Sequence, residues 1–239
     1  MTISSQTFDI EESISRINKI LESDNAVIRP SGDYDIRTLG IHQAVVCKSA
    51  CLSITLHINK FDIDQNDNLY KQYKCLLSEF GAVVSECNGA LEYCVLNKNV
   101  FCTVIQVDNN ETLDKVIDVA AKTCSLSFIM NKRFAAINLN PVMIGLGISF
   151  NNVKFTREAF DSNLDEELLW YGDAVDESIK YSQRARTGML GNSLIITKSV
   201  YDRLSEPYRN FFTYDNMIDG FTSSLINKGL EAWEKENLK

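Results

Sequence analysis

The chain has 239 residues, of which 45% are hydrophobic and 23% charged, and it contains only three prolines. This composition is typical of an ordered globular protein with one substantial core, and it excludes a disordered chain. The net charge of -8 argues against a nucleic-acid-binding surface, which needs basic side chains to displace counterions.

The seven cysteines include no Cys-x-x-Cys pair, and most lie within apolar runs. We therefore predict buried, reduced thiols in a cytoplasmic protein rather than disulfides or a metal site. No basic-then-apolar leader opens the sequence, and no window reaches the ~18 apolar residues needed to cross a bilayer. On these grounds we expect a soluble protein.

An amphipathic helix is expected over residues 9–21. Acidic residues suit its N-terminus, and its apolar side chains fall on one stripe. The stripe includes Ile10, Ile14, Ile17 and Leu21. We assign residues 1–35 to this helix and its lead-in, and residues 36–239 to the main domain.

The first half of the main domain is predicted to begin with strands at 36–46 and 50–58. Helical periodicity then runs over 66–80, and Gly81 is expected to end that helix. Two further strands, at 82–87 and 90–96, flank Asn88-Gly89. Both residues of this dipeptide tolerate positive φ, so a hairpin is predicted there.

The second half is predicted to continue with a helix and a buried strand, followed by alternating short elements. The expected ranges are a helix at 111–130, capped near Asn110 or Thr112, strands at 142–150, near 153 and at 168–171, a helix at 173–186, a strand at 193–197, and helices at 198–204 and 220–235. The order strand, helix, hairpin, helix, strand is the βαββαβ pattern of a ferredoxin-like α+β fold with C-terminal additions.

One segment carries the most specific motif. Gly172-Asp173-Ala174-Val175-Asp176 reads as a tight turn that opens a helix, and Lys180 follows Asp176 by one helical turn. The segment resembles the Gly-Asp-Ala-Val-Asn-x-x-x-Arg signature of class III nucleotidyl cyclases, with Asp176 in place of Asn and Lys180 in place of Arg.

Other segments extend this resemblance over residues 36–235, and it is more specific toward the Pycsar pyrimidine cyclases of bacterial antiphage defence. The counterparts of the family motifs are His57-Ile58-Asn59-Lys60-Phe61-Asp62, Asn88-Gly89, Gly147-Ile148-Ser149-Phe150-Asn151 and Trp233. The resemblance implies a class III cyclase homology domain.

The resemblance also implies two metal-ligating aspartates, and neither is present. Their positions are His57, at the end of the first core strand, and Gly89, at the hairpin. Mg²⁺ prefers carboxylate oxygens, whereas imidazole suits Mn²⁺ or Zn²⁺, and Gly89 has no side chain. We therefore expect no cofactor, with Mg²⁺ or Mn²⁺ needed only if the chain is active through displaced ligands such as Asp62 or Asp64.

The remaining site residues follow from the same resemblance. Asp176 and Lys180 take the transition-state positions, in degenerate form. The implied nucleotide-binding residues are Asn59, Lys60, Arg157 and Glu167, of which Glu167 would read the base. The structural alternative is an i,i+4 acid–base pair for Asp176 and Lys180, and solvated surface charges for Arg157 and Glu167.

No Ser or Cys lies near a general base as a hydrolase requires, and no phosphate-binding P-loop is present. The sequence thus predicts a Pycsar-like pseudoenzyme that serves as a regulatory subunit or dimer partner. Class III cyclases form wreath-like dimers with active sites between the subunits, so a homodimer or a heterodimer with a complete cyclase is expected. A nucleoside triphosphate is the candidate ligand, with neither nucleic acid nor membrane as a partner.

Two alternatives stay open. The first is an active pyrimidine cyclase, a phosphorus–oxygen lyase, that converts UTP or CTP to cyclic UMP or cyclic CMP. The second is a structural interaction module that binds no nucleotide.

Overall fold

The computed structural model describes residues 10–22, 27–30, 34–57, 67–85, 90–97, 99–107, 109–158, 167–186 and 192–237. Its helices are α1 (Ile10–Glu22), α2 (Asp67–Ser85), α3 (Asn110–Ala136), α4 (Asp173–Arg184), α5 (Lys198–Tyr201), α6 (Glu206–Arg209) and α7 (Lys228–Asn237), with a 3-10 turn η1 (Ile36–Thr38). Its strands are β1 (Val27–Ile28), β2 (Ala44–His57), β3 (Ala90–Asn97), β4 (Val100–Gln106), β5 (Met143–Glu158), β6 (Glu167–Tyr171), β7 (Leu194–Ile196), β8 (Thr213–Asp215) and β9 (Gly220–Ser223).

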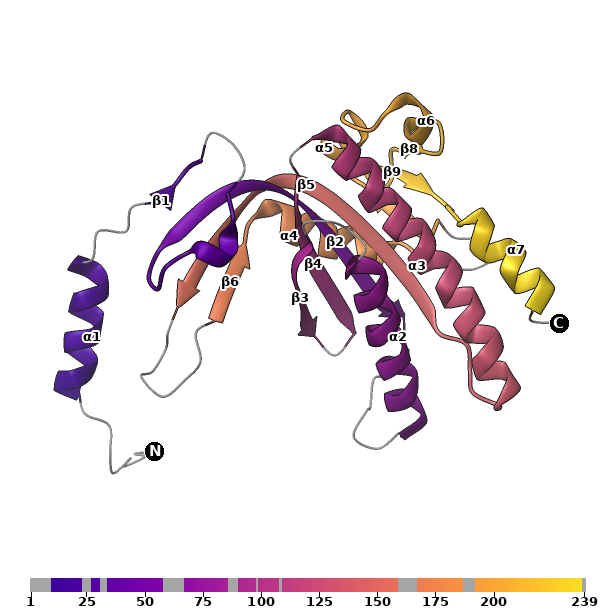
Figure 1. Ribbon diagram of the computed structural model, residues 1–239, viewed down its shortest axis with the longest axis horizontal. Helices are drawn as coiled ribbons and strands as arrows, with labels where there is room; N and C mark the ends of the chain where they lie inside the picture. Colours follow the sequence, from indigo (N-terminus) through magenta and orange to yellow (C-terminus); the bar gives the residue numbers. More distant parts are fainter. Residues whose placement is uncertain are drawn as a thin grey trace.

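One mixed sheet carries the strands in the order β3-β4-β2-β5-β7-β9-β8, with β1 paired to β2 and β6 to β5. Its first four strands alternate with α2 and α3 along the chain as a βαββαβ unit, so the predicted ferredoxin-like α+β core is confirmed. The long strands β2 and β5 form the axis of the molecule (Figure 1). They run antiparallel from Ala44 opposite Thr156 to His57 opposite Met143.

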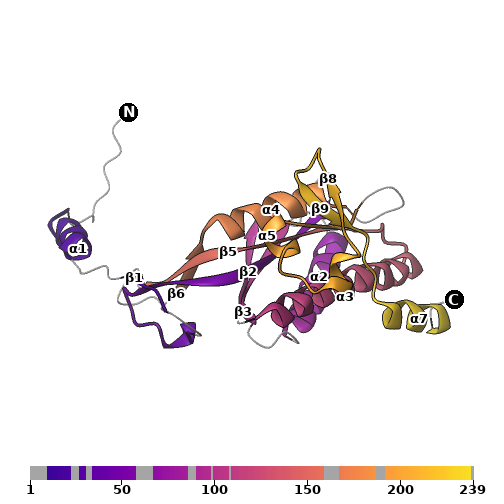
Figure 2. The same cartoon turned by 90° about the horizontal axis from the view of Figure 1, so that it is seen from above.

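The two faces of this sheet are covered differently. Figure 2 shows α4 on one side and α2 and α3 on the other. Successive side chains of a strand point to opposite faces, so alternate residues of β2 enter different layers. Leu52, Ile54 and Leu56 belong to the apolar core under α2 and α3, whereas Cys47 and Cys51 pack in the layer that contains α4 residues. Burial on both faces explains the nearly continuous apolar run.

The N-terminal helix α1 was predicted correctly to within a residue at each end. It lies apart from the sheet, beyond β1, in both views (Figures 1 and 2). The side chains of its apolar stripe are exposed, by 63% for Ile10, 51% for Ile14, 51% for Ile17 and 74% for Leu21. Within the described residues, these four side chains of the stripe are thus left exposed.

The predicted hairpin is wrong. Residues 82–85 continue α2 through Gly81, and the hairpin instead joins β3 to β4 just before Val100. A glycine inside a helix costs about 1 kcal/mol, and burial of Val83 and Val84 outweighs that cost. The prediction omitted β4 because its residues from Val100 to Ile105 are all buried, which removes the alternation that marks a strand. Asn88-Gly89 lies outside the described residues.

Other predicted boundaries also differ from the structure. Residues 36–38 form η1 rather than a strand, because the Asp35 side chain accepts a hydrogen bond from the Arg37 backbone N–H at 3.1 Å. The strand at 142–150 continues to Glu158 and includes Val153. The terminal helix begins at Lys228 rather than Gly220, since residues 220–223 form β9. The helix from Asp173 is confirmed as α4, and α3 runs on past 130 to Ala136, with Asn109 as its N-cap.

Candidate functional site

Helix α4 carries the predicted transition-state positions, and it lies very close to the sheet. It can do so because two residues of β5 beneath it are glycines. A Cβ at Gly147 would collide with the backbone carbonyl of Ser178, and one at Gly145 would collide with that of Ala185. Any side chain at either glycine would therefore push α4 off the sheet.

Hydroxyl groups line the contact between α4 and β2. Ser178 shares a 2.7 Å hydrogen bond with Ser53, and Ser182 shares one of 2.7 Å with Thr55. Both helix serines also donate to backbone carbonyls of their own helix, so they accept from the strand hydroxyls. We call these two pairs, with Gly145 and Gly147 beside them, the polar seam. Because its serine and threonine side chains are buried, each unpaired hydroxyl would cost about 1–3 kcal/mol.

His57, the last residue of β2, lies at the end of the polar seam. Its Nε2 lies 2.6 Å from the backbone carbonyl of Ala185, immediately after α4. A carbonyl oxygen only accepts, so Nε2 carries the proton and donates. Burial lowers the pKa of His57, and the nearby Arg186 charge lowers it further, against the hydrogen bond to Ala185. The side chain is therefore a neutral donor that satisfies a carbonyl at the helix C-terminus.

The β3–β4 hairpin meets β2 beside this histidine. The Leu56 N–H donates to the Asn99 carbonyl at 2.8 Å, and the Asn99 amide donates back to the Leu56 carbonyl at 3.4 Å. Assignment of the hairpin position to Gly89 depended on the wrong hairpin, and Gly89 is outside the described residues. The turn that adjoins His57 contains Asn99 instead. Asn97-Lys98-Asn99, set between two apolar runs, was the signal that could have revealed it.

His57 and Asn99 do not fit a pair of Mg²⁺ ions. One offers an imidazole whose Nε2 is used by Ala185, and the other offers an amide, whereas Mg²⁺ selects carboxylate oxygens. Within the parts of the chain that the structure describes, no group of three or more His, Cys, Asp or Glu side chains could hold a metal ion. Asp62 and Asp64 lie outside those parts. No catalytic step through a metal follows from the described residues.

Asp176 and Lys180 lie one turn apart on α4, and both are exposed. They form no ion pair with each other among the described residues, although other i,i+4 pairs, such as Lys198 with Asp202, do form one. Their neighbour Glu177 is oriented by the Ser149 hydroxyl, which donates to its carboxylate at 2.6 Å. The two transition-state positions thus face away from the sheet.

Arg157 and Glu167 lie at the opposite end of the long strands from His57. Arg157 is fourteen residues further along β5 than Met143, the partner of His57, which is roughly 45 Å of strand. The Arg157 guanidinium donates to the Arg37 carbonyl at 3.3 Å. Glu167 is exposed, and in the antiparallel register of β6 with β5 it lies opposite Glu158. One chain therefore cannot bring Arg157 and His57 to the same nucleotide. Asn59 and Lys60 are outside the described residues.

A polar group next to Arg157 was not predicted from the sequence. Glu158 accepts a hydrogen bond from Thr156 at 2.6 Å and lies 2.9 Å from Nδ1 of His42. Burial raises the pKa of Glu158, but the contacts with Thr156 and His42, together with the charge of Lys154, leave the pKa below its ordinary value. The His42 backbone has a positive φ of 59° and donates to the Arg157 carbonyl at 2.7 Å. These contacts fix the end of β5.

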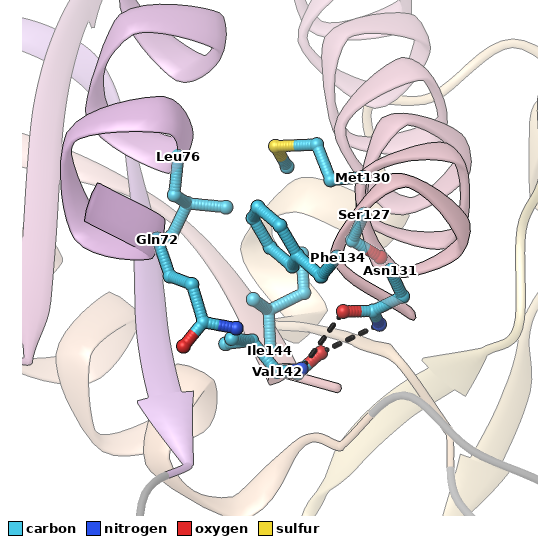
Figure 3. A pocket seen from close by; sticks show the side chains of 8 residues that line it. All are labelled: Gln72, Leu76, Ser127, Met130, Asn131, Phe134, Val142 and Ile144. Carbon is cyan, nitrogen blue, oxygen red and sulfur yellow. Dashed lines mark hydrogen bonds between the residues drawn. The ribbon is translucent and has the colours of Figure 1, made fainter. Parts of the chain in front are cut away.

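A small pocket lies on the other face of the sheet, between α2, α3 and the start of β5 (Figure 3). Its volume of about 10 Å³ suits a single water molecule. Asn131 closes one side by bonding both the N–H and the carbonyl of Val142 at 2.8 Å. The cavity is too small for a nucleotide and belongs to the core.

The sheet order and the placement of α4 define the fold of a class III nucleotidyl cyclase domain, and solved structures confirm it. A class III adenylyl cyclase-like ATP-binding protein from Pseudomonas aeruginosa aligns with a TM-score of 0.67 and 16% identity over 93% of this chain and 49% of that one. A bacterial light-regulated adenylyl cyclase aligns with a TM-score of 0.62 and 12% identity over 96% of this chain and 68% of that one. This chain thus spans about half the length of the first of these proteins.

Among curated proteins, the chain is similar to a uridylate cyclase from Gulbenkiania mobilis. The two are 20% identical over an alignment 262 positions long, which covers 99% of this chain and all of that protein. No family model matches the sequence. The resemblance to class III cyclases, and to uridylate cyclases among them, is therefore confirmed, and the chain is a class III nucleotide cyclase-like protein. No described helix is both long and apolar enough to span a membrane.

Proposed function

We propose that this protein is a Pycsar-type class III cyclase-like subunit that does not itself cyclise nucleotides efficiently and acts as the partner of a complete cyclase. The contact between His57 and Ala185 carries the proposal. At the position where the family has a metal-binding aspartate, this chain has a neutral donor committed to the end of α4. A carboxylate at this position would accept hydrogen bonds and could not replace it.

The exposed residues of α4 support a role in a dimer. Asp176 and Lys180 are free of the sheet, and Lys180 can still attract a phosphate as a point charge, without the bidentate fork of arginine. Because Arg157 and His57 lie at opposite ends of the paired strands β2 and β5, a site that combines both ends needs two chains. This subunit would supply the transition-state half to a partner that holds the metals.

The nucleotide affinity of this chain alone is proposed to be weak and independent of metal. Asn59, Lys60 and Lys180 would attract a triphosphate, whereas Asp176 and the net charge of -8 would repel it. Arg157 and Glu167 lie at the other end of the long strands, so they would act on that nucleotide only from a second chain. The opposing charges limit the expected Kd to about millimolar, or roughly 4 kcal/mol of binding.

The experiment is reconstitution of this chain with a class III cyclase that has both metal-binding carboxylates. Cyclic nucleotide production should rise when this chain is added, and Lys180→Ala in this chain should remove the increase. Gln183→Ala, an exposed change on the same helix, is the matched control and should leave the increase unchanged. Equal rates with and without this chain would refute the proposed role.

A second function, an active pyrimidine cyclase with Asp62 or Asp64 as displaced metal ligands, is favoured by the full-length similarity to a protein named uridylate cyclase. It predicts cyclic UMP or cyclic CMP from this chain alone. Loss of that product on replacement of Asp62 or Asp64 by Asn would identify the displaced ligand.

A further inference from the structure

The turn between β8 and β9, residues 216–219, holds one flank of α4. The Tyr181 hydroxyl donates to the Asp219 carbonyl at 2.6 Å, and the Arg184 guanidinium donates to the Ile218 carbonyl at 3.3 Å. The two donors lie three residues apart on α4, so they are neighbours on the same side of the helix. The turn therefore contacts α4 at two points about one helical turn apart.

Tyr181 is packed into this contact by its ring as well as by its hydroxyl. The side chain is only 8% exposed, and it belongs to an apolar cluster with Ala185 and Ile195, against which Ile218 of the turn also packs. A Cβ at Gly220, just after the turn, would lie 3.3 Å from the ring. The packing fixes where the ring lies, and the hydroxyl then reaches the turn.

The turn has a fixed shape of its own. Asp219 has a positive φ of 56°, its N–H donates to the Asp215 carbonyl at 2.9 Å, and its carboxylate accepts from the Tyr214 hydroxyl at 2.8 Å. The Asp215 carboxylate accepts from the Met217 N–H at 2.8 Å. Such side-chain to backbone bonds stabilise a turn locally. The Asp219 carbonyl is therefore a fixed acceptor for Tyr181.

These contacts hold α4 on a second side. Ser178 and Ser182 face the sheet through the polar seam. Successive residues of a helix are about 100° apart, so Tyr181 lies on the flank between these serines and the exposed Lys180. The seam fixes the height of α4 above the sheet, and a contact on the flank resists rotation of the helix about its own axis. Such a rotation would redirect Lys180 and Asp176.

We propose that Tyr181 is a positioning residue, whose hydrogen bond to the β8–β9 turn sets the rotation of α4 and thereby the direction of Lys180. The inference rests on the proposed function, in which Lys180 acts on a nucleotide that a partner cyclase holds. Misplacement of a reacting group by about 1 Å can change a rate on the order of 100-fold. Tyr181 thus affects the nucleotide only through Lys180.

The test uses Tyr181→Phe in reconstitution with a class III cyclase that has both metal-binding carboxylates. The variant keeps the ring in its apolar cluster and loses only the donor. The maximal increase in cyclic nucleotide production should fall at least about tenfold, whereas the concentration of this chain that gives half of its own maximum should not change. Tyr208→Phe is the matched control, because it also removes a hydroxyl bonded to the turn of another element, the Asp118 carboxylate of α3, far along the chain from α4. It should leave both values unchanged.

Hydrogen exchange of backbone amides separates this inference from the proposed function. In Tyr181→Phe the amides of α4 should exchange at least about tenfold faster, whereas those that join β2 to β5 should keep their protection and so show that the variant is folded. Tyr208→Phe should leave exchange in α4 unchanged. Faster exchange in α4, with no increase from the unmodified chain in reconstitution, supports the role of Tyr181 and contradicts only the proposed function.

Three results would overturn the inference. The first is exchange in α4 of Tyr181→Phe that matches the unmodified chain. The second is a maximal increase for Tyr181→Phe as large as that of the unmodified chain. The third is a loss that appears only as a higher half-maximal concentration, which would place Tyr181 in the contact with the partner rather than behind Lys180.

Discussion

At the end of β2, His57 makes a contact that a carboxylate could not make. Its Nε2–H donates a hydrogen bond to the carbonyl of Ala185, which links the end of β2 to the end of α4. The partly buried imidazole is neutral in the folded protein. The sequence has a histidine where the resemblance to class III cyclases implies an aspartate. It did not reveal the partner, because Ala185 is distant along the chain and only the packing of α4 on the glycines brings it near.

His57 should make stability depend on pH. Burial lowers its pKa below the ordinary 6.5, so the unfolded chain binds the proton more readily than the folded one. The stabilisation is therefore present above pH 6.5 and falls as the pH drops from there toward the lowered pKa. His57→Gln keeps a donor for Ala185 but does not titrate. Thermal melting from pH 5 to 8 should show a shallower acid-side loss in this variant, and identical profiles would contradict the assignment.

Gly147 should not tolerate a side chain. Its added Cβ would meet the Ser178 backbone, which cannot move aside as a side chain end could, so Gly147→Ala should destabilise by about 2 kcal/mol or more. Gly81→Ala is the matched control, since nothing lies within 4 Å of its Cβ position and it lies inside α2. That variant should gain about 0.5–1 kcal/mol. Urea unfolding measures both, and a Gly147→Ala loss below about 0.5 kcal/mol would refute the close approach.

At the scale of elements, α4 is held partly by the hydroxyl pairs of the polar seam. Ser53→Ala and Ser178→Ala should each destabilise, because each leaves a buried hydroxyl without its partner. The double variant should lose less than the sum, with a coupling of about 1 kcal/mol in urea unfolding. Additive losses would mean that the pair does not interact in solution.

Ser49 provides the control on the same strand. Its hydroxyl is buried and has no hydrogen-bond partner among the described residues. Ser49→Ala should therefore be neutral or slightly stabilising, unlike Ser53→Ala. A loss as large as that of Ser53→Ala would show that a group outside the described residues, or a water, bonds Ser49.

The elements also show what the sequence could predict. The helix from Asp173 and the stripe of α1 were predicted because 3.6-residue periodicity and turn residues mark them locally. The βαββαβ order was predicted although one of its strands was misplaced. The hairpin failed because Asn88-Gly89 has a strong local preference, whereas Val83 and Val84 gain more by extending α2 into the core.

The candidate site was predictable only in part. The motif at Gly172 to Lys180 located α4, and the departures at its polar positions were read directly from the sequence. Asn99 was missed because its place beside His57 depends on how the hairpin pairs with β2. The distance between Arg157 and His57 was likewise hidden, since it follows from the length of β5 rather than from any motif.

At the scale of the whole molecule, the chain has the fold of a class III cyclase domain, and we propose that it lacks the metal ligands of that family. The long strands separate Arg157 from His57, and the described residues at the His57 end provide an imidazole and an amide. Two-metal stabilisation of the transition state contributes several kcal/mol, and each ~1.36 kcal/mol changes the rate about tenfold. The metal-free site that we propose should therefore turn over nucleotides more slowly by orders of magnitude.

The most direct test is mass spectrometry of the purified full chain incubated with UTP, CTP, ATP or GTP and either Mg²⁺ or Mn²⁺. No cyclic nucleotide above the enzyme-free control is expected with any substrate. A cyclic product that forms with this chain alone and disappears in Lys180→Ala would contradict the account and would establish an active cyclase.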